Sequence, residues 1–165
     1  MPRARWLTDD EQRTWRGYRR MKALLDLAVG RDLARDSGLS EPDYDVLSTL
    51  TEKAGPPWRA SDLAARLLWS SSRLAHQVGR MERRGLVSRT PSDDDRRGAL
   101  IHLTQLGRAT LESAAPPHVA SVRRNFIDLL TPEELQLVAD IAWRVVTNLT
   151  DDVSDVGTGA EGVHR

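Results

Sequence analysis

The chain has 165 residues, a formal net charge of zero and no cysteine. This length suits one domain, or two lobes that share a core, and a composition of 39% hydrophobic and 29% charged residues is ordinary for a soluble globular protein. The lack of cysteine excludes disulfides, thiolate metal sites and cysteine-based redox sensing. Because the sequence has neither a long apolar run nor a signal-peptide core, we expect a cytoplasmic protein without a membrane span.

Two helices are predicted in the first third of the chain. Thr8 and Glu11 form the pattern of a capping box at the start of the first helix. Apolar residues then recur at spacings of three and four, as on one face of an amphipathic helix. Ser40 and Asp43 repeat the capping pattern for the second helix, and the Gly-Pro-Pro run at 55–57 ends it.

The middle of the chain, residues 61–104, predicts two short helices followed by a strand hairpin. The first helix covers Ser61–Leu68, and the serine run at 70–72 caps the second, which ends at Gly85. The buried face of the second helix is expected to hold Leu74, Val78 and Met81. Its other faces are expected to carry Arg73, His76, Gln77, Arg80, Arg83 and Arg84.

Two apolar segments, 86–90 and 99–103, predict the strands of the hairpin. Arg96 and Arg97 lie at its tip, where a loop can present them to a partner. A helix, a turn, a second helix and a basic-tipped hairpin describe a winged helix-turn-helix, whose second helix enters the DNA major groove.

The last third of the chain predicts helices again. Thr104 can cap a long helix, which the proline pair at 116–117 is expected to interrupt or kink. The Thr-Pro-Glu-Glu run at 131–134 begins a final helix whose apolar residues alternate by three and four up to residue 149. The acidic, glycine-containing stretch 150–165 is expected to be a disordered tail.

The run SSSRLAHQVGRMERRGLVSR, followed by DDDRRGALIHLTQLG, resembles the MarR-type regulators (multiple antibiotic resistance regulators). The resemblance rests on a wing that carries Asp-x-Arg, alternating apolar residues and Leu-Thr-x-x-Gly. These positions are here Asp95, Arg97, Leu103, Thr104 and Gly107. The resemblance implies a third, short wing strand at 58–59, whereas Ala75 departs from it, because relatives commonly have serine there and one hydroxyl contact to DNA is then missing.

The expected fold is mainly α with a small β-wing. Residues 40–103 form the winged helix-turn-helix domain, and residues 8–36 with 104–149 form a helical dimerisation region. The long apolar stripes of the first and last helices can be buried against a second copy in a two-fold dimer, as the resemblance implies, or the two helices can pack on each other within one chain. Two recognition helices one DNA turn apart would read a palindromic operator on double-stranded DNA.

Charge is segregated along the chain, and this pattern points to the DNA contacts. Residues 70–90 hold five arginines and one glutamate, a basic patch that suits phosphate binding, although a solvated charged face would look the same. Arginine suits guanine and glutamine suits adenine by bidentate hydrogen bonding, and serines at a helix start can bind phosphate or act only as caps. The candidate DNA-binding residues are Ser70, Ser71, Ser72, Arg73, His76, Gln77, Arg80, Arg96 and Arg97.

The wing tip has two interpretations. Arg97, with Arg96 as second choice, is expected to enter the minor groove, whose negative potential favours arginine, and the resemblance implies that Asp95 positions it. The aspartate run 93–95 could suggest a metal site, but a carboxylate run beside two arginines favours a structural loop. The histidines show no ligand spacing, so we expect no metal and no cofactor.

The resemblance also implies an effector pocket between the dimer helices and the DNA-binding lobe. A small aromatic or phenolic effector could bind there, although aromatic residues at helical spacing more often belong to a core. By position, the candidate pocket residues are Trp15, Tyr18, Arg19, Tyr44 and His118.

We therefore predict a sequence-specific transcriptional regulator, in the repressor mode common in the resembled family, that binds DNA as a homodimer and is released by an effector. The alternative is a dimeric winged-helix adaptor that binds protein in place of DNA. We expect no enzyme, because no nucleophile elbow, phosphate loop or metal-ligand cluster is present.

Overall fold

The computed structural model describes residues 5–52, 57–92 and 98–157, with side chains described up to residue 150. The chain divides into two compact units, residues 1–122 and 123–165. The elements of the first unit are α1 (Asp9–Ser37), α2 (Glu41–Thr51), β1 (Trp58–Arg59), α3 (Ala60–Arg66), α4 (Ser71–Arg83), β2 (Val87–Pro91), β3 (Ala99–Leu103) and most of α5 (Gln105–Asn125). The second holds the end of α5, the 3-10 helix η1 (Ile127–Leu129) and α6 (Pro132–Gly157).

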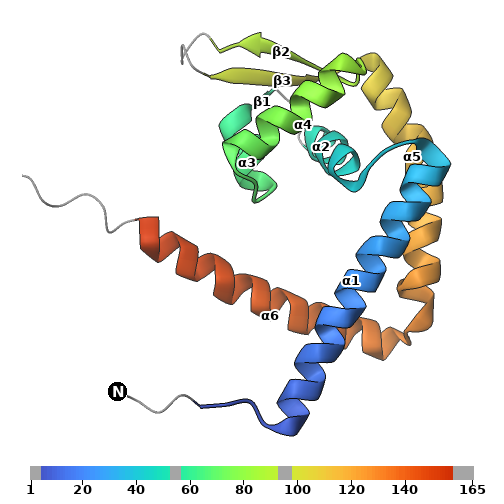
Figure 1. The fold of residues 1–165 in the computed structure, drawn as a ribbon, viewed down its shortest axis with the longest axis vertical. Helices are drawn as coiled ribbons and strands as arrows, with labels where there is room; N and C mark the ends of the chain where they lie inside the picture. The colour runs from blue at the N-terminus through green and yellow to red at the C-terminus, as the bar shows by residue number, and fades with distance from the viewer. Residues whose placement is uncertain (1–4, 53–56, 93–97, 158–165) are drawn as a thin grey trace, which may run out of the picture. The chain divides into compact units, whose positions relative to one another are not determined.

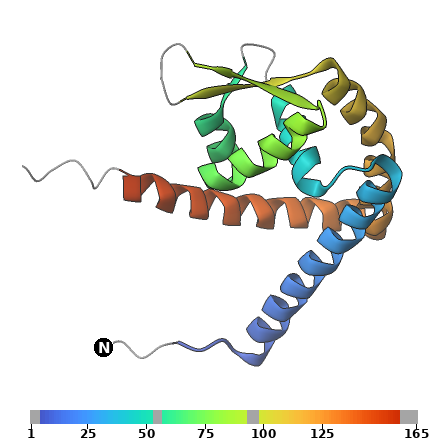
Figure 2. The ribbon, with the colours of Figure 1, turned by 45° about the horizontal axis from the view of Figure 1, so that its top comes forward.

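The predicted winged helix-turn-helix is confirmed. Strands β1, β3 and β2 form an antiparallel sheet in that order, and α3 and α4 lie beside it (Figure 1). In the register, Trp58 and Arg89 both face Ile101 on the central strand. The short third strand at 58–59 is therefore present, and Figure 2 shows the hairpin of β2 and β3 with its top turned toward the viewer.

One apolar core joins α2, α3, α4 and the sheet to the ends of two longer helices. Leu47, Leu63 and Met81 are fully enclosed in it, each with no exposed surface. Leu33 near the end of α1 and Leu111 on α5 belong to the same cluster. The winged-helix lobe is therefore continuous with the C-terminal part of α1 and the N-terminal part of α5.

The helix starts follow the predicted capping chemistry. Thr8 and Glu11 form a complete capping box, as do Ser40 and Asp43. In the second unit the backbone N–H of Thr131 donates to Glu134 at 2.9 Å, and the N–H of Glu134 donates back to the Thr131 hydroxyl at 3.3 Å. All three boxes satisfy amides that a helix start leaves without intrahelical partners.

Two helices differ from the sequence predictions. Helix α5 continues through Pro116 and Pro117, so an interruption there is wrong, and a kink at the prolines stays a prediction. Ala114 and Ser121 are buried on either side of the prolines, and the Ser121 hydroxyl donates to Asp32 at 2.7 Å, so packing holds both halves in helical conformation. Helix α5 then ends at Asn125.

Helix α6 reaches Gly157, so the helix extends past residue 150, where we expected irregular chain to begin. Residues 158–165 of the expected tail lie outside the described residues.

Leu68 occupies the turn between α3 and α4 with a φ of 55°, in the left-handed region that favours glycine. The N–H of Leu68 donates to the carbonyl of Ala65, and the N–H of Trp69 donates to that of Ala64. This pair of bonds is a Schellman motif, which normally has glycine at the Leu68 position. Gly85 fulfils that role at the end of α4, with a φ of 72°.

Gly107 marks a close approach between α5 and the start of the wing. A Cβ atom at Gly107 would lie 2.0 Å from the carbonyl oxygen of Leu86. The Thr104 hydroxyl accepts from the N–H of Gly107 at 2.9 Å and lies 2.7 Å and 3.0 Å from the carbonyl oxygens of Gly85 and Leu86. The Leu-Thr-x-x-Gly segment therefore fastens α5 to the end of α4.

Candidate nucleic-acid interface

Helix α4 presents the predicted recognition residues at its N-terminal end. The Ser70 hydroxyl accepts from the N–H of Arg73 at 3.2 Å and caps the helix, as predicted. Leu74, Val78 and Met81 are buried, also as predicted. The solvent-exposed candidates on or just before α4 are Ser70, Ser71, Ser72, Arg73, His76 and Arg80.

Arg73 is held against an aromatic ring. Its guanidinium carbon lies 4.3 Å from the centroid of the Trp69 ring, within the range of a cation–π interaction. Because Trp69 itself packs against the apolar core, the ring gives Arg73 a fixed platform at the start of α4.

Gln77 is not on an exposed face, so that part of the sequence prediction is wrong. Its side chain is 2% exposed, and its amide nitrogen donates to Oδ1 of Asp43 at 2.7 Å. Its amide oxygen accepts from the guanidinium of Arg80. The spacing from Leu74 to Gln77 and from Gln77 to Met81, three and then four residues, places Gln77 on the buried face of the helix. Because glutamine is polar, the sequence prediction assigned it to an exposed face.

Asp43 and Arg84 connect α4 to α2. The sequence predicted no role in the site for either residue. Arg84 donates to Oδ2 of Asp43 at 2.7 Å and to the carbonyl oxygen of Gly38 at 3.1 Å. Burial raises the pKa of Asp43, but hydrogen bonds from Ser40 and Arg84 outweigh it and hold that pKa below its usual value. The carboxylate is therefore charged at neutral pH and ties the end of α4 to α2.

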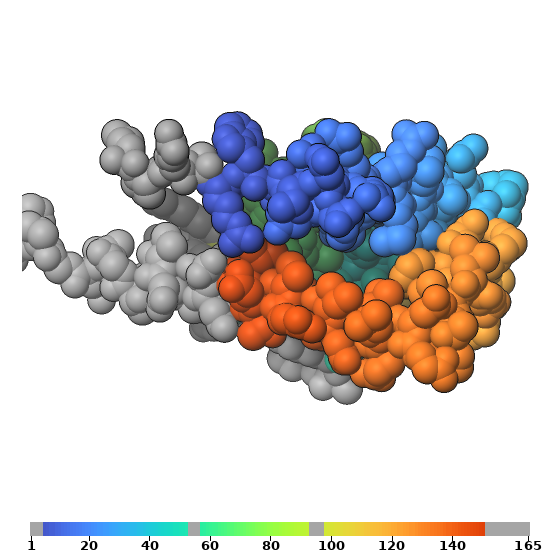
Figure 3. All heavy atoms as spheres, turned by 90° about the horizontal axis from the view of Figure 1, so that it is seen from below, coloured from blue at the N-terminus to red at the C-terminus, as the bar shows by residue number. Residues whose placement is uncertain are grey.

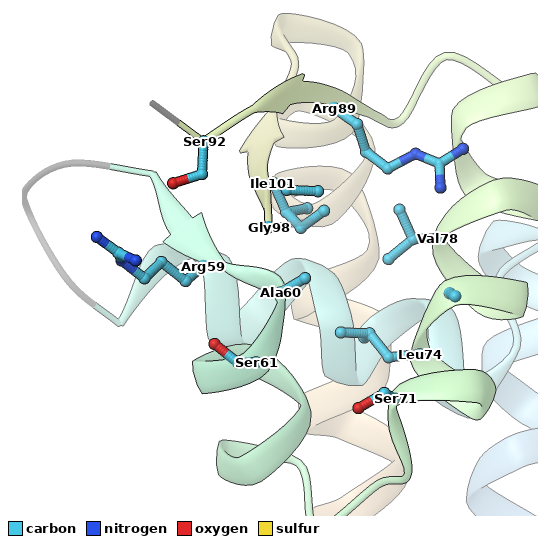
Figure 4. Close-up of a pocket in the computed structure, with 12 residues that line it drawn as sticks. Arg59, Ala60, Ser61, Ser71, Leu74, Val78, Arg89, Ser92, Gly98 and Ile101 are labelled. Carbon is cyan, nitrogen blue, oxygen red and sulfur yellow. The ribbon is translucent and has the colours of Figure 1, made fainter. Parts of the chain in front are cut away.

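Two hollows flank the exposed side of α4. One, of about 290 Å³, lies toward α2 and is lined by Pro42, Trp69, Ser72, Arg73, His76, Gln77 and Arg80. The other, of about 330 Å³, lies between α3, α4 and the sheet (Figure 4), and its lining includes Ser61 of α3 and Ser71 and Leu74 of α4. Ala75 lines this second hollow, so the missing hydroxyl falls on the wing side of the helix.

The base of the wing is tied to α4 by an ion pair. Arg89 on β2 donates to Glu82 on α4 at 2.6 Å, and this hydrogen bond lowers the pKa of Glu82. The wing-tip candidates Asp95, Arg96 and Arg97 lie outside the described residues.

Comparison with known proteins identifies this arrangement. The model of the MarR family matches residues 37–98, which span α2 to the wing. The regulator PecS of Dickeya dadantii is 30% identical over 137 residues, which are 81% of this chain and 80% of PecS. This chain belongs to the MarR family.

Solved MarR-family structures agree over nearly the whole chain. AbsC of Streptomyces coelicolor is 42% identical, with a TM-score of 0.83 over 90% of this chain and 99% of AbsC. Sco3205 of the same organism, solved in complex with DNA, is 36% identical, with a TM-score of 0.84 over 90% of this chain and 93% of Sco3205. The chain is thus a MarR-family transcriptional regulator with a DNA-binding winged helix.

The predicted effector-pocket residues of this MarR-family chain form two separate pairs. The rings of Trp15 and Tyr18 stack with centroids 5.8 Å apart, and those of Tyr44 and His118 lie 4.2 Å apart. Where α1 meets α2, Gly30 lies against Glu41, and the helical rise puts Gly30 about 22 Å along α1 from Trp15. Within one chain the two pairs therefore do not share a pocket, and Arg19, exposed beside Tyr18, belongs with the first pair.

The Tyr44–His118 pair lies between α2 and α5. Nδ1 of His118 is buried without a hydrogen-bond partner among the described residues. Burial lowers the pKa of His118, partly offset by the nearby Asp45 carboxylate, so the ring is neutral at neutral pH.

Neither a metal site nor a membrane helix is found in the described part of this MarR-family chain. Its described residues contain no group of three histidine, cysteine, aspartate or glutamate side chains that could hold a metal ion. The aspartate run 93–95 lies outside them. None of the described helices combines the length and apolar character needed to cross a lipid bilayer.

Proposed function

We propose that this MarR-family regulator binds a roughly palindromic operator as a homodimer and represses transcription. The observation that carries this proposal is α4, which buries one apolar face while it exposes three arginines, a histidine and a serine-capped N-terminus. Free amides and hydroxyls at a helix start bind phosphate, and arginine reads guanine in the major groove. The similar Sco3205 was solved in complex with DNA, which supports DNA binding by this chain.

The apolar faces of α1 and α6 support the homodimer. On α1, Trp15, Tyr18, Met21, Leu24 and Leu27 are each about half exposed. On α6, Leu137, Ile141, Trp143, Val145 and Leu149 are likewise exposed. Figure 3 shows the atoms of α1, in blue, on the surface of the molecule. Monomeric proteins rarely expose contiguous apolar faces of this extent, and a two-fold partner would cover them.

A small aromatic or phenolic effector is proposed to release the DNA. The Tyr44–His118 pair supports this, because it places an aromatic ring and a buried, unpartnered ring nitrogen between α2 and α5. An effector that forms one hydrogen bond with this nitrogen and stacks on Tyr44 fits that chemistry. Such an effector can shift DNA binding only by its difference in affinity between the two states of the dimer.

Selection of bound fragments from genomic DNA by the purified protein tests the function. The wild-type protein should sediment as a dimer and retain fragments with a shared, two-fold symmetric motif, with an affinity that falls steeply with salt. Arg97→Ala should weaken binding to the selected duplex without lowering the melting temperature. A monomer, or a protein that retains no DNA at low salt, would refute the proposal and favour the protein-binding adaptor.

A further inference from the structure

A buried carboxylate connects α2 to the middle of the recognition helix. Asp43 is 4% exposed, and its two oxygens have different partners. Oδ2 accepts from Arg84 at 2.7 Å, and from the N–H and hydroxyl of Ser40 at 3.0 Å and 2.8 Å. Oδ1 accepts from the amide nitrogen of Gln77 at 2.7 Å. Because α2 and α4 pack side by side (Figure 1), this bond fixes the Gln77 side chain between them.

Gln77 also contacts Arg80, so its amide connects Asp43 to Arg80. Its amide carries both a donor and an acceptor, and with the donor held by Asp43 the oxygen must point toward Arg80, from which it accepts a hydrogen bond. Arg80 itself is exposed and lines the same hollow as Arg73 and His76. One guanidinium nitrogen is thereby fixed, while the remaining N–H groups stay available for a ligand.

The neutral amide between the two charges has a consequence for binding. A carboxylate in direct contact with Arg80 would compete with phosphate for the guanidinium, whereas an amide orients it and leaves its charge uncompensated. A side chain already held in its bound orientation loses less rotamer freedom on binding, which strengthens the complex.

We propose that Gln77 is a positioning residue, which, anchored by Asp43, holds the Arg80 guanidinium ready for DNA. This inference rests on the proposed DNA-binding function and replaces the base-reading role that the sequence predicted for Gln77. Two arginines of the same helix serve as internal controls. Arg73 is held by the Trp69 ring and not by Gln77, and the Arg83 side chain makes no hydrogen bond or ion pair within residues 5–52, 57–92 and 98–150.

A double-mutant cycle separates positioning of Arg80 from general support of the helix. Gln77→Met keeps the length of the side chain and removes the amide. We expect it to weaken binding of the genomically selected duplex about five- to tenfold, a coupling usual for residues in one hydrogen-bond network. In an Arg80→Ala background the same change should have less than about a twofold effect, because its target is gone, whereas in an Arg73→Ala background the full loss should persist.

The outcomes of the cycle are distinct. Equal losses from Gln77→Met in all three backgrounds mean that the change displaces α4 as a whole, and they overturn the positioning role while the proposed function stands. If the wild-type protein itself binds no selected duplex, the proposed function fails and the inference falls with it.

A second measurement needs neither DNA nor a variant. Nuclear magnetic relaxation of the arginine Nε–H groups in the free protein should give Arg80 an order parameter above about 0.6, the usual limit for a flexible group, and Arg83 one below it. An Arg80 as flexible as Arg83 overturns the proposal, whether or not Gln77→Met folds.

Discussion

Replacing Gly107 by alanine tests the contact between α5 and the start of the wing. The added Cβ would lie 2.0 Å from the carbonyl oxygen of Leu86 and 2.9 Å from Cδ1 of Leu103. The leucine tip can rotate, but the backbone oxygen cannot move without displacing the end of α4. Relief therefore requires α5 to shift by about 1 Å, which strains the core and weakens the hydrogen bonds between Thr104 and Leu86.

The expected loss of stability follows from these two effects. Overpacking of this kind costs about 1–3 kcal/mol, and each weakened hydrogen bond adds about 1 kcal/mol. We expect the free energy of unfolding to fall by about 3–5 kcal/mol, which in a protein of this size lowers the melting temperature by roughly 6–20 °C.

Calorimetry at fixed protein concentration measures this change, and Gly79→Ala is the matched control. A Cβ at Gly79 meets nothing within 4 Å, and alanine in a helix is about 0.5–1 kcal/mol more stable than glycine. If Gly107→Ala melts within about 2 °C of the wild type, the close approach is not a constraint and the reasoning is refuted.

Three further changes test other parts of the first unit. Leu68→Gly should raise the free energy of unfolding, measured with urea, by about 0.5–1 kcal/mol, because Leu68 is 91% exposed and strained at φ 55°. An unchanged free energy of unfolding would show that no strain is stored there. Arg84→Met should cost about 2 kcal/mol by urea unfolding, since buried Asp43 loses a charged donor, and Arg83→Met, if equally costly, would contradict this. For His118 the folded pKa is lowered, so the unfolded chain binds more protons, and the free energy of unfolding should fall as pH drops through about 6.5. His118→Phe keeps a ring against Tyr44 and should reduce the pH dependence of the free energy of unfolding, measured with urea between pH 7.5 and 5.5. An unaltered pH dependence would exclude His118 as its source.

Local signals in the sequence predicted most of the fold. Capping residues such as Thr8 and Ser40, the apolar spacing of α4 and the glycine at its end depend on neighbours within a few positions, and the structure confirms them. The prolines of α5 were misleading because burial of Ala114 and Ser121, which local propensity does not report, holds the helix together.

The position of the candidate site was predictable from the sequence, but the hydrogen bonds within it were not. The position of α4 and the exposure of Arg73, His76 and Arg80 followed from periodicity. The burial of Gln77 did not, because its partner Asp43 lies 34 residues away in the sequence. A polar residue on an apolar face shows its role only when its long-range partner is known.

The hydrogen bonds of Arg84 to Asp43 and to the carbonyl oxygen of Gly38 connect the C-terminal end of α1 to α4. Helix α1 is 29 residues long, about 43 Å, so a tilt of about 5° at its C-terminal end moves its N-terminal end by roughly 4 Å. In the proposed homodimer, a tilt of α1 would therefore be transmitted through these hydrogen bonds to α4. The separation of the two α4 helices would then depend on how the N-terminal ends of α1 are packed, far from the DNA.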